Sequence, residues 1–246
     1  MDQVSVTAAS GLQSRMEALD LVANNLANTT TGGFKLDREF YSVFTAADNE
    51  ADGASDTSLP LIQKQWTDFS QGVLTPTGSP LDLALSGKGF FAVNGPSGPL
   101  YTRNGSFQLS PSGQLTTTEG YAVLDTNGQP IQIQSEAPLE VGADGSLTQS
   151  GETLGQLQVV DFQDRSALQK LGNSYFSLSD PRTQPSPAAD TTVQQGKTEN
   201  SNVAPAESAV RLVGLMRQFE MLQKAITITT DMNKQALTEV ARVSGG

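Results

Sequence analysis

The stretch ASGLQSRMEALDLVANNL, residues 9–26, carries apolar side chains at intervals of three and four residues. Such intervals place side chains on one face of a helix, and a mean spacing of about 3.5 residues favours a supercoiled partner. The apolar positions of the stretch are Ala9, Leu12, Met16, Leu19, Ala23 and Leu26. The sequence therefore predicts a helix from about Val4 to Asn28 whose apolar stripe needs a partner to cover it.

The same rhythm returns at the other end of the chain, from about Ala204 to Val243. Its apolar positions are Ala209, Leu212, Met216, Phe219, Ile226, Leu237 and Val240. Pro205 suits the first turn of this helix, where a backbone N–H has no partner inside the helix. We expect the two terminal helices to pair as an α-helical coiled-coil domain, within one chain or between copies, which is the geometry of an assembly subunit.

Between these helices the sequence predicts strands. Apolar and polar residues alternate from Leu81 to Leu85, and an apolar run follows from Gly89 to Val93. Turn signals then recur at short intervals, the clearest being Asn94-Gly95, Asn104-Gly105, Asn127-Gly128 and Asp144-Gly145. Short strands joined by such turns indicate an antiparallel β domain, so the predicted fold class is α+β.

Changes in composition divide the chain into four parts. The glycine pair Gly32-Gly33 is a strong helix stop, so the first part, residues 1–33, is the N-terminal helix of the terminal helical domain. The others are an extended arm and linker at 34–80, the central β domain at 81–196, and the C-terminal helix of the terminal helical domain at 197–246.

Two segments inside these parts are expected to lack regular structure. The run from Ala46 to Ser58 contains no large apolar residue and is interpreted as a loop of the arm that is either flexible or ordered by a partner. The stretch from Ser179 to Gly196 contains three prolines and few apolar residues, and is interpreted as a linker back toward the C-terminal helix.

Composition excludes several classes of protein. The chain has 246 residues, a net charge of −11, no cysteine and no histidine. Disulfides, thiolate chemistry, a Ser-His-Asp triad and imidazole metal ligands are therefore impossible. The acidic balance argues against a nucleic-acid partner, because phosphate binding needs clustered Lys and Arg. We expect no enzyme, no cofactor, no metal site and no small-molecule substrate.

The charge is unevenly distributed. Residues 1–28 carry −2 and residues 201–246 carry +1, which leaves −10 of the total of −11 in the middle of the chain. Nearly neutral helices can pack against copies of themselves without strong repulsion. The first residues show no apolar signal segment, and no stretch reaches the ~18 apolar residues of a membrane span. We expect export, if it occurs, to use no cleaved signal peptide.

The string Asn24-Asn25-Leu26-Ala27-Asn28 is unusual at a helix end, because asparagine is a poor helix former. One interpretation is a C-cap with a solvated polar face. The interpretation that we favour is that these amides bond to neighbouring backbone in a close-packed assembly.

The sequence gives weaker evidence for catalytic groups than for an assembly surface. Carboxylates such as Asp82 and Asp161 have the chemistry for acid–base work, but they fall at strand and turn positions where a solvated face is the better interpretation. Gly87-Lys88-Gly89 lacks the Gly-Lys-Ser/Thr order of a phosphate loop and is interpreted as part of a hairpin.

Several strings, taken in order along the chain, resemble the flagellar rod and hook protein family. They are NNLAN (24–28), TTGGFK (30–35), GSPLDLAL (78–85), GKGFFAV (87–93), YTRNGSF (101–107), QG (195–196) and SNV (201–203). The resemblance covers both termini and most of the middle. Within the family, RQFEM at 217–221 and the chain length resemble the proximal rod branch, and the distal rod branch is the second choice.

The resemblance implies a structural subunit of the bacterial flagellar basal body. It implies export through the flagellar type III apparatus and helical assembly in the periplasm into the rod, a drive shaft that transmits torque and encloses the export channel. The implied partners are other copies of the chain, other flagellar rod proteins and the export apparatus.

We expect the assembly interface to use apolar and amide side chains from both termini. They are Leu12, Met16, Leu19, Asn24, Asn25, Leu26, Asn28, Phe34, Leu212, Met216, Phe219, Met221, Ile226 and Leu237. The alternative function, from another class, is a β-rich adhesin or glycan-binding protein with a coiled-coil stalk. Such a protein usually carries an exposed aromatic platform, and here only Trp66 and four tyrosines are available.

Overall fold

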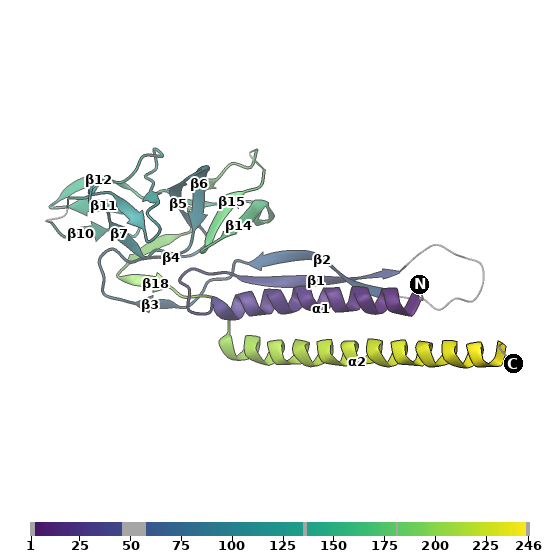
Figure 1. The fold of residues 1–246 in the computed structure, drawn as a ribbon. Coiled ribbons are helices and arrows are strands. Elements are labelled where there is room, and N and C mark those ends of the chain that lie inside the picture. Colours follow the sequence, from purple (N-terminus) through teal and green to yellow (C-terminus); the bar gives the residue numbers. More distant parts are fainter. Residues whose placement is uncertain (1–2, 46–57, 135–136, 181, 245–246) are drawn as a thin grey trace. The chain divides into compact units, whose positions relative to one another are not determined.

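The computed structural model describes residues 3–45, 58–134, 137–180 and 182–244, and the chain divides into two compact units (Figure 1). The helical unit comprises Met1–Ala27, Asp37–Thr67 and Ala204–Gly246, and the β unit comprises Asn28–Leu36 and Asp68–Val203. The predicted α+β class is confirmed, with a helix near each terminus and an antiparallel β region between them.

Two helices dominate the helical unit. Helix α1 spans Gln3–Ala27 and α2 spans Pro205–Ser244, close to the predicted ranges. They pack against each other and run in opposite directions (Figure 1). The packed residues form one small cluster, in which Ala18, Val22 and Leu215 are buried and Leu19 and Leu212 are partly buried. Only Leu19 and Leu212 of this cluster belong to the predicted stripes, so the buried face is shifted from the predicted one, and the stripe residues Met16 and Met216 are exposed. In the described ranges, neither helix is long and apolar enough to cross a membrane.

The arm folds as a two-stranded sheet in the same unit. Strand β1 spans Leu36–Thr45 and β2 spans Ser58–Asp68. The Thr67 hydroxyl donates to Asp37 Oδ1 at 2.7 Å, which ties the two strands where they approach the β unit in the chain. The loop predicted at 46–58 lies outside the described residues, except for Ser58.

The β unit contains sixteen strands within the described ranges. They are β3 (Leu74–Pro76), β4 (Leu83–Ser86), β5 (Phe90–Gly95), β6 (Gly98–Thr102), β7 (Phe107–Leu109), β8 (Leu115–Thr117), β9 (Ala122–Val123), β10 (Leu139–Val141), β11 (Ser146–Gln149), β12 (Glu152–Gln156), β13 (Val159–Asp161), β14 (Leu168–Gly172), β15 (Tyr175–Leu178), β16 (Ser186–Pro187), β17 (Thr192–Gln195) and β18 (Lys197–Glu199). The largest sheet has the order β14-β15-β6-β5-β9-β8-β7, and β13 pairs with both β5 and β16.

Strand β5 lies at the centre of the core. Successive side chains of a strand point to opposite faces, and here both faces are covered. Phe91 and Val93 belong to one buried cluster, and Phe90 and Ala92 belong to another. Burial on both sides explains why this segment of the sequence is continuously apolar rather than alternating.

The predicted linker at 179–196 is wrong in its second half. Strand β17 pairs with β4, with Val193 opposite Leu85, and Val193 is buried in the core. One buried valine is enough to pack this short strand on the core, because the polar neighbours of Val193 in β17 point away from the core. The final connection to α2 runs through β18, which pairs with β3.

Candidate functional site

Three charged side chains meet in the interior of the β unit, and we call them the charged hub: Lys35, Arg103 and Glu199. Glu199 accepts a hydrogen bond from Lys35 Nζ at 2.6 Å through Oε1, and one from Arg103 Nη1 at 3.2 Å through Oε2. All three side chains are at most 2% exposed. Since ions lose their hydration on burial, each of them needs a partner, and here one carboxylate serves two cations.

Local structure fixes Glu199 in place. The pairing of β18 with β3 sets it opposite Leu74. Its Oε1 also accepts the backbone N–H of Gly72 at 2.8 Å, and its carbonyl oxygen accepts the N–H of Gly33 at 2.7 Å. The carboxylate is therefore held by backbone as well as by the two cations.

Arg103 follows β6 and has further contacts of its own. Its Nη2 donates to the Gly87 carbonyl at 2.7 Å, and its guanidinium lies 5.4 Å from the centre of the Phe90 ring. A guanidinium suits this position, because its planar fork can bond in two directions while its face covers an aromatic ring.

The charged hub carries an excess of positive charge, because it contains two cations and one carboxylate. Burial lowers the pKa of Lys35, and the neighbouring Glu199 carboxylate opposes this shift. Burial likewise lowers the pKa of Arg103, again against the effect of Glu199. Both shifts have the direction expected when two cations are desolvated and share a single counter-charge.

Asn202 extends the hub into a network of backbone bonds. Its Oδ1 accepts the N–H of Leu36 at 2.7 Å, and its Nδ2 donates to the carbonyl oxygens of Asp68 at 2.8 Å and Ser70 at 3.1 Å. Leu36, Asp68 and Asn202 lie next to three of the points at which the chain passes from one unit to the other. The network therefore gathers the ends of the connecting segments within the β unit.

Two glycines are required by close approach of the backbone. A Cβ atom on Gly33 would lie 2.3 Å from the Asn104 nitrogen, and the φ of +66° at this residue already favours glycine. A Cβ atom on Gly72 would lie 2.0 Å from the Asn200 carbonyl oxygen. The predicted helix stop at Gly32-Gly33 thus has a second purpose, since Gly33 lets the segment reach the hub.

Phe34 and Lys170 cover the segment that carries Lys35. Phe34 is buried, and the Lys170 ammonium lies 3.6 Å from the centre of its ring. Lys170 Nζ also donates to the Lys35 carbonyl at 2.7 Å. Phe34, an expected interface residue, is therefore packed inside the β unit of its own chain.

The expected interface residues before Phe34 are distributed over different environments. Asn25 is buried in the helical unit, where its Nδ2 donates to the Asp37 carbonyl at 2.8 Å and its Oδ1 accepts the Asp37 N–H at 3.0 Å. Asn28 begins the turn that follows α1, with its carbonyl oxygen accepting the Thr31 N–H and its Oδ1 accepting the Thr31 hydroxyl. Met16 and Asn24 are exposed, and Leu12, Leu19 and Leu26 are half-buried.

On α2 the expected residues fall into two groups. Leu212, Phe219 and Ile226 are half-buried, whereas Met216 and Met221 are exposed. The side chain of Leu237 lies outside the part of the chain whose side chains are described. Sequence reasoning did not select Val210, which is the most exposed large apolar residue among the described side chains of this helix.

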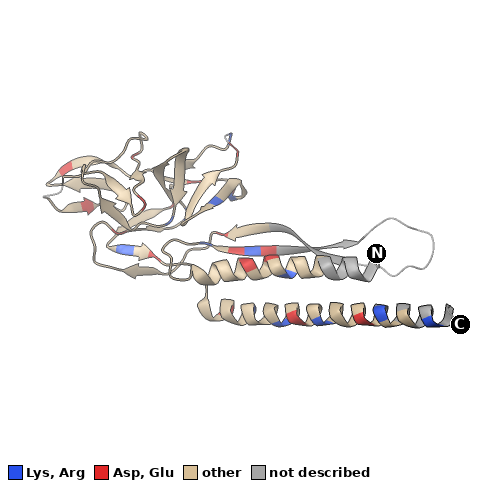
Figure 2. Ribbon diagram, viewed as in Figure 1, with Lys and Arg blue, Asp and Glu red and all other residues tan. Residues whose placement is uncertain are grey.

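A set of exposed apolar side chains runs along α2, and we call it the outer stripe: Val210, Met221, Ile228 and Met232. Each of these side chains is between 51% and 75% exposed. Basic and acidic residues alternate elsewhere along α2 (Figure 2), and Arg211 pairs with Glu39 of β1. The outer stripe is thus an exposed apolar surface on α2, in addition to the apolar residues Leu212 and Leu215 that pack on α1.

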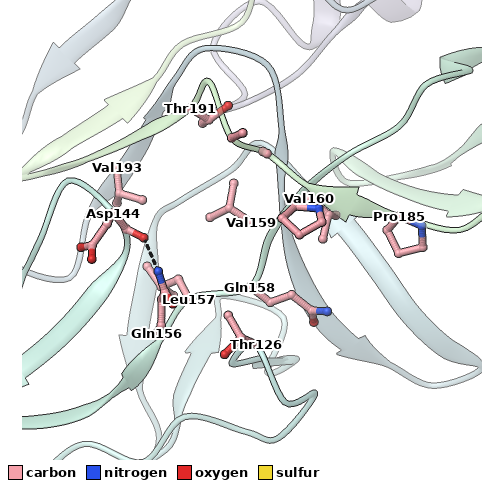
Figure 3. Close-up of a pocket in the computed structure, with 13 residues that line it drawn as sticks. Thr126, Asp144, Gln156, Leu157, Gln158, Val159, Val160, Pro185, Thr191 and Val193 are labelled. Carbon is pink, nitrogen blue, oxygen red and sulfur yellow. Dashed lines mark hydrogen bonds between the residues drawn. The ribbon is translucent and has the colours of Figure 1, made fainter.

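A cavity of about 440 Å³ in the β unit is the place to look for small-molecule chemistry (Figure 3). Its only carboxylate is Asp144, whose Oδ1 accepts the Ser146 hydroxyl and N–H. These bonds lower the pKa of Asp144. Val159, Val160 and Pro185 line much of the rest. A single turn-capping carboxylate among aliphatic groups offers no acid–base pair, and the ranges that the structure describes hold no metal-ligating cluster.

Three family models match the chain. They are the flagella basal body rod protein model at residues 6–35, the flagellar hook protein FlgE/F/G D1 domain at residues 84–149, and the flagellar basal body rod FlgEFG protein C-terminal model at residues 194–239. Each matched segment supplies one hub residue: Lys35, Arg103 and Glu199, respectively. The hub therefore joins the three parts by which the chain is identified.

Curated relatives match over nearly the whole length. The flagellar basal-body rod protein FlgF of Caulobacter vibrioides is 32% identical over 246 residues, which covers 99% of this chain and 100% of the relative. FlgG of Buchnera aphidicola subsp. Schizaphis graminum is 33% identical, and the match covers 94% of this chain and 96% of the relative. FlgG of Bacillus subtilis is 30% identical and covers 95% and 97%.

Proposed function

The chain belongs to the flagellar basal-body rod protein family, and we propose that it is a structural, non-enzymatic subunit of the basal-body rod. A FlgF-type subunit is the first choice, because the FlgF relative matches over 99% of this chain and 100% of its own length. A FlgG-type subunit is the second choice, because FlgG relatives match at similar identity. The adhesin alternative is not carried forward, because the matches are to rod proteins.

The outer stripe of α2 is the observation that carries this proposal. Val210, Met221, Ile228 and Met232 are separated by 11, 7 and 4 residues, or about three, two and one helical turns, so they share one face. Leu212 and Leu215 pack on α1, and Leu212 is nine residues, about two and a half turns, from Met221. The helix therefore has two apolar faces on roughly opposite sides, and α1 covers one of them.

A helix with two apolar faces suits a filament subunit. We propose that α1 and α2 pair as a coiled coil within the subunit, and that the outer stripe packs on a helix of the neighbouring subunit. Contact between two different surfaces of successive copies is heterologous and does not close on itself, so it generates a helical tube. The methionines of the stripe can adapt to such a neighbour, because their side chains are unbranched and flexible.

The remaining predictions about assembly follow from this arrangement. The arm of β1 and β2 carries the half-exposed Trp66, with Arg38 stacked 5.8 Å from its ring, and we propose that this arm locks adjacent subunits. The subunit would cross the inner membrane through the flagellar type III apparatus and join other rod proteins in the periplasm, where the tube encloses the export channel.

The experiment is a matched pair of charge substitutions in the full chain. Ile228→Glu places a carboxylate on the outer stripe, and Gln218→Glu adds the same charge at an exposed position off the stripe. In a strain that lacks the wild-type gene, Ile228→Glu should abolish rod incorporation and swimming, because burial of an unpaired carboxylate is costly. Gln218→Glu should support both. Normal rods and swimming with Ile228→Glu would contradict the proposal.

A further inference from the structure

The pocket that receives Lys35 is complete without Lys35. Glu199 retains Arg103 and the Gly72 N–H as partners, so its charge stays balanced and both carboxylate oxygens stay bonded. The Ser70 carbonyl, which accepts from Lys35 Nζ at 2.7 Å, also accepts from Asn202 Nδ2. Every acceptor that Lys35 uses therefore has a second donor.

The segment that carries Lys35 adds no strand to the sheets of the β unit. Residues 28–33 form turns, and residues 34–35 have no regular structure before β1 begins at Leu36. This segment is held by packing of the Phe34 side chain and by three single hydrogen bonds described above. The Gly33 and Leu36 N–H groups donate to the β unit, and Lys170 Nζ donates to the Lys35 carbonyl. Its departure would break no pairing among β3 to β18, which include all the strands of the core sheet.

Charge makes the attachment of this segment marginal. With Lys35 in place, two cations share one carboxylate, whereas without it Arg103 and Glu199 form a balanced pair. The extra cation is desolvated, as the lowered pKa of Lys35 also indicates. The other charged groups near its ammonium are Asp68, which attracts it, and Arg103, which repels it.

We propose that residues 28–36 form a latch, whose Lys35 enters a preformed socket around the Arg103–Glu199 pair and leaves it again while the β unit stays folded. The buried surplus cation keeps the latch reversible. Since the latch follows α1 directly in the chain, its closure anchors the residues that follow the C-terminal end of α1, and its opening releases them.

The test is hydrogen exchange of single amides in the full-length free subunit. Gly33 and Leu36 report the latch, because their N–H groups bond to the Glu199 carbonyl and to Asn202 Oδ1. Ala92 and Leu115 report the β unit, because their N–H groups bond to Gln158 and Ile131. We expect Gly33 and Leu36 to exchange at least tenfold faster than Ala92 and Leu115, with similar protection factors for the two latch amides.

Two lysine-to-methionine variants separate the latch from ordinary ion-pair stabilisation. Lys35→Met removes the surplus cation and leaves no acceptor without a donor, so exchange of Gly33 and Leu36 should slow several-fold. Lys170→Met removes a bond to the latch without relieving the hub, so exchange of the same amides should accelerate. Ala92 and Leu115 should be unchanged in both variants.

Three results would overturn the latch. The first is exchange of Gly33 and Leu36 at the rate of Ala92 and Leu115 in the wild type. The second is faster latch exchange in Lys35→Met, which would make Lys35 a simple stabilising cation. The third is loss of protection at Ala92 and Leu115 in Lys35→Met, which would mean that the socket does not stand without it.

Discussion

The β unit and the helical unit bury their apolar residues to very different extents. In the β unit, β5 is covered on both faces, and its phenylalanines contact other rings edge-on, as Phe91 does with Phe107 at 5.2 Å. Among the described side chains of the helical unit, the contact between α1 and α2 buries a small apolar cluster of Ala18, Val22 and Leu215. One unit has a core of its own, whereas the other leaves the outer stripe of α2 uncovered.

This difference explains how a single chain can be both stable and ready to assemble. A helix gains most of its stability in proteins from packing of its apolar face rather than from propensity. Helix α2 also contains the run Ile226-Thr227-Ile228-Thr229-Thr230, whose three threonine hydroxyls donate to carbonyls one turn earlier. β-Branched residues lower helix propensity, so this helix depends on packing to an unusual degree.

The largest expected effect is a loss of stability of the β unit when the carboxylate of the charged hub is removed. Glu199→Gln leaves Lys35 and Arg103 buried without a counter-charge, so it should destabilise the β unit by about 3–5 kcal/mol. Denaturant unfolding followed by near-UV circular dichroism, which reports the buried tyrosines and phenylalanines, measures the loss. Glu152→Gln, an exposed site with the same change of charge, is the control and should leave the midpoint unchanged. Equal midpoints for the two variants would contradict the role of the hub.

A smaller effect is expected from the helical side. Leu215→Ala removes the largest buried side chain between α1 and α2, so the helix pair should lose about 2 kcal/mol, the lower end for a leucine truncation because the cluster is small. Far-UV circular dichroism should show reduced helix content, while the near-UV signal of the β unit stays intact. Loss of both signals together would mean that the two units unfold as one.

The dependence of stability on pH gives a weaker test of the hub. Because burial lowers the pKa of Lys35 below its ordinary value of 10.5, the unfolded chain binds more protons than the folded one between these two values. The contribution of Lys35 to the free energy of unfolding should therefore rise as pH increases through that window. The rise should be absent in Lys35→Met, and an equal rise in both proteins would assign it to another group.

The smallest signal concerns the arm. Trp66 is the single tryptophan of the chain and is about half exposed, so its fluorescence reports the arm selectively. If the arm contacts a neighbouring subunit, emission should shift to shorter wavelength on assembly, since burial removes the ring from water. An unchanged spectrum in assembled rods would place Trp66 away from every interface.

The terminal helices were predictable because their signal is local. Intervals of three and four residues indicate a helix without knowledge of the rest of the fold, and both α1 and α2 end close to the predicted residues. The buried face was not predicted, since Ala18, Val22 and Leu215 lie outside the predicted stripes. Strand β5 was predictable for the same reason, since its apolar run is bounded by glycine. The family resemblance rested on strings that lie in these same regions.

The charged hub was not predictable, because its members are distant in sequence. Lys35 and Glu199 are separated by 164 residues, and Arg103 and Glu199 by 96. A charged residue in a sequence is normally interpreted as solvated, and nothing near Glu199 indicates otherwise. The available hint was Lys35 itself, which directly follows two glycines and a phenylalanine in a segment too constrained for an ordinary surface turn.

Hydrogen exchange along the whole chain, compared between the free subunit and the assembled rod, tests the central claim most directly. The account predicts that β5 and β6 are strongly protected in both states, whereas α2 around Ile228 exchanges rapidly in the free subunit and becomes protected in the rod. Protection of α2 in the free subunit equal to that of β5 would contradict it, because the helical unit would then be complete without a neighbour.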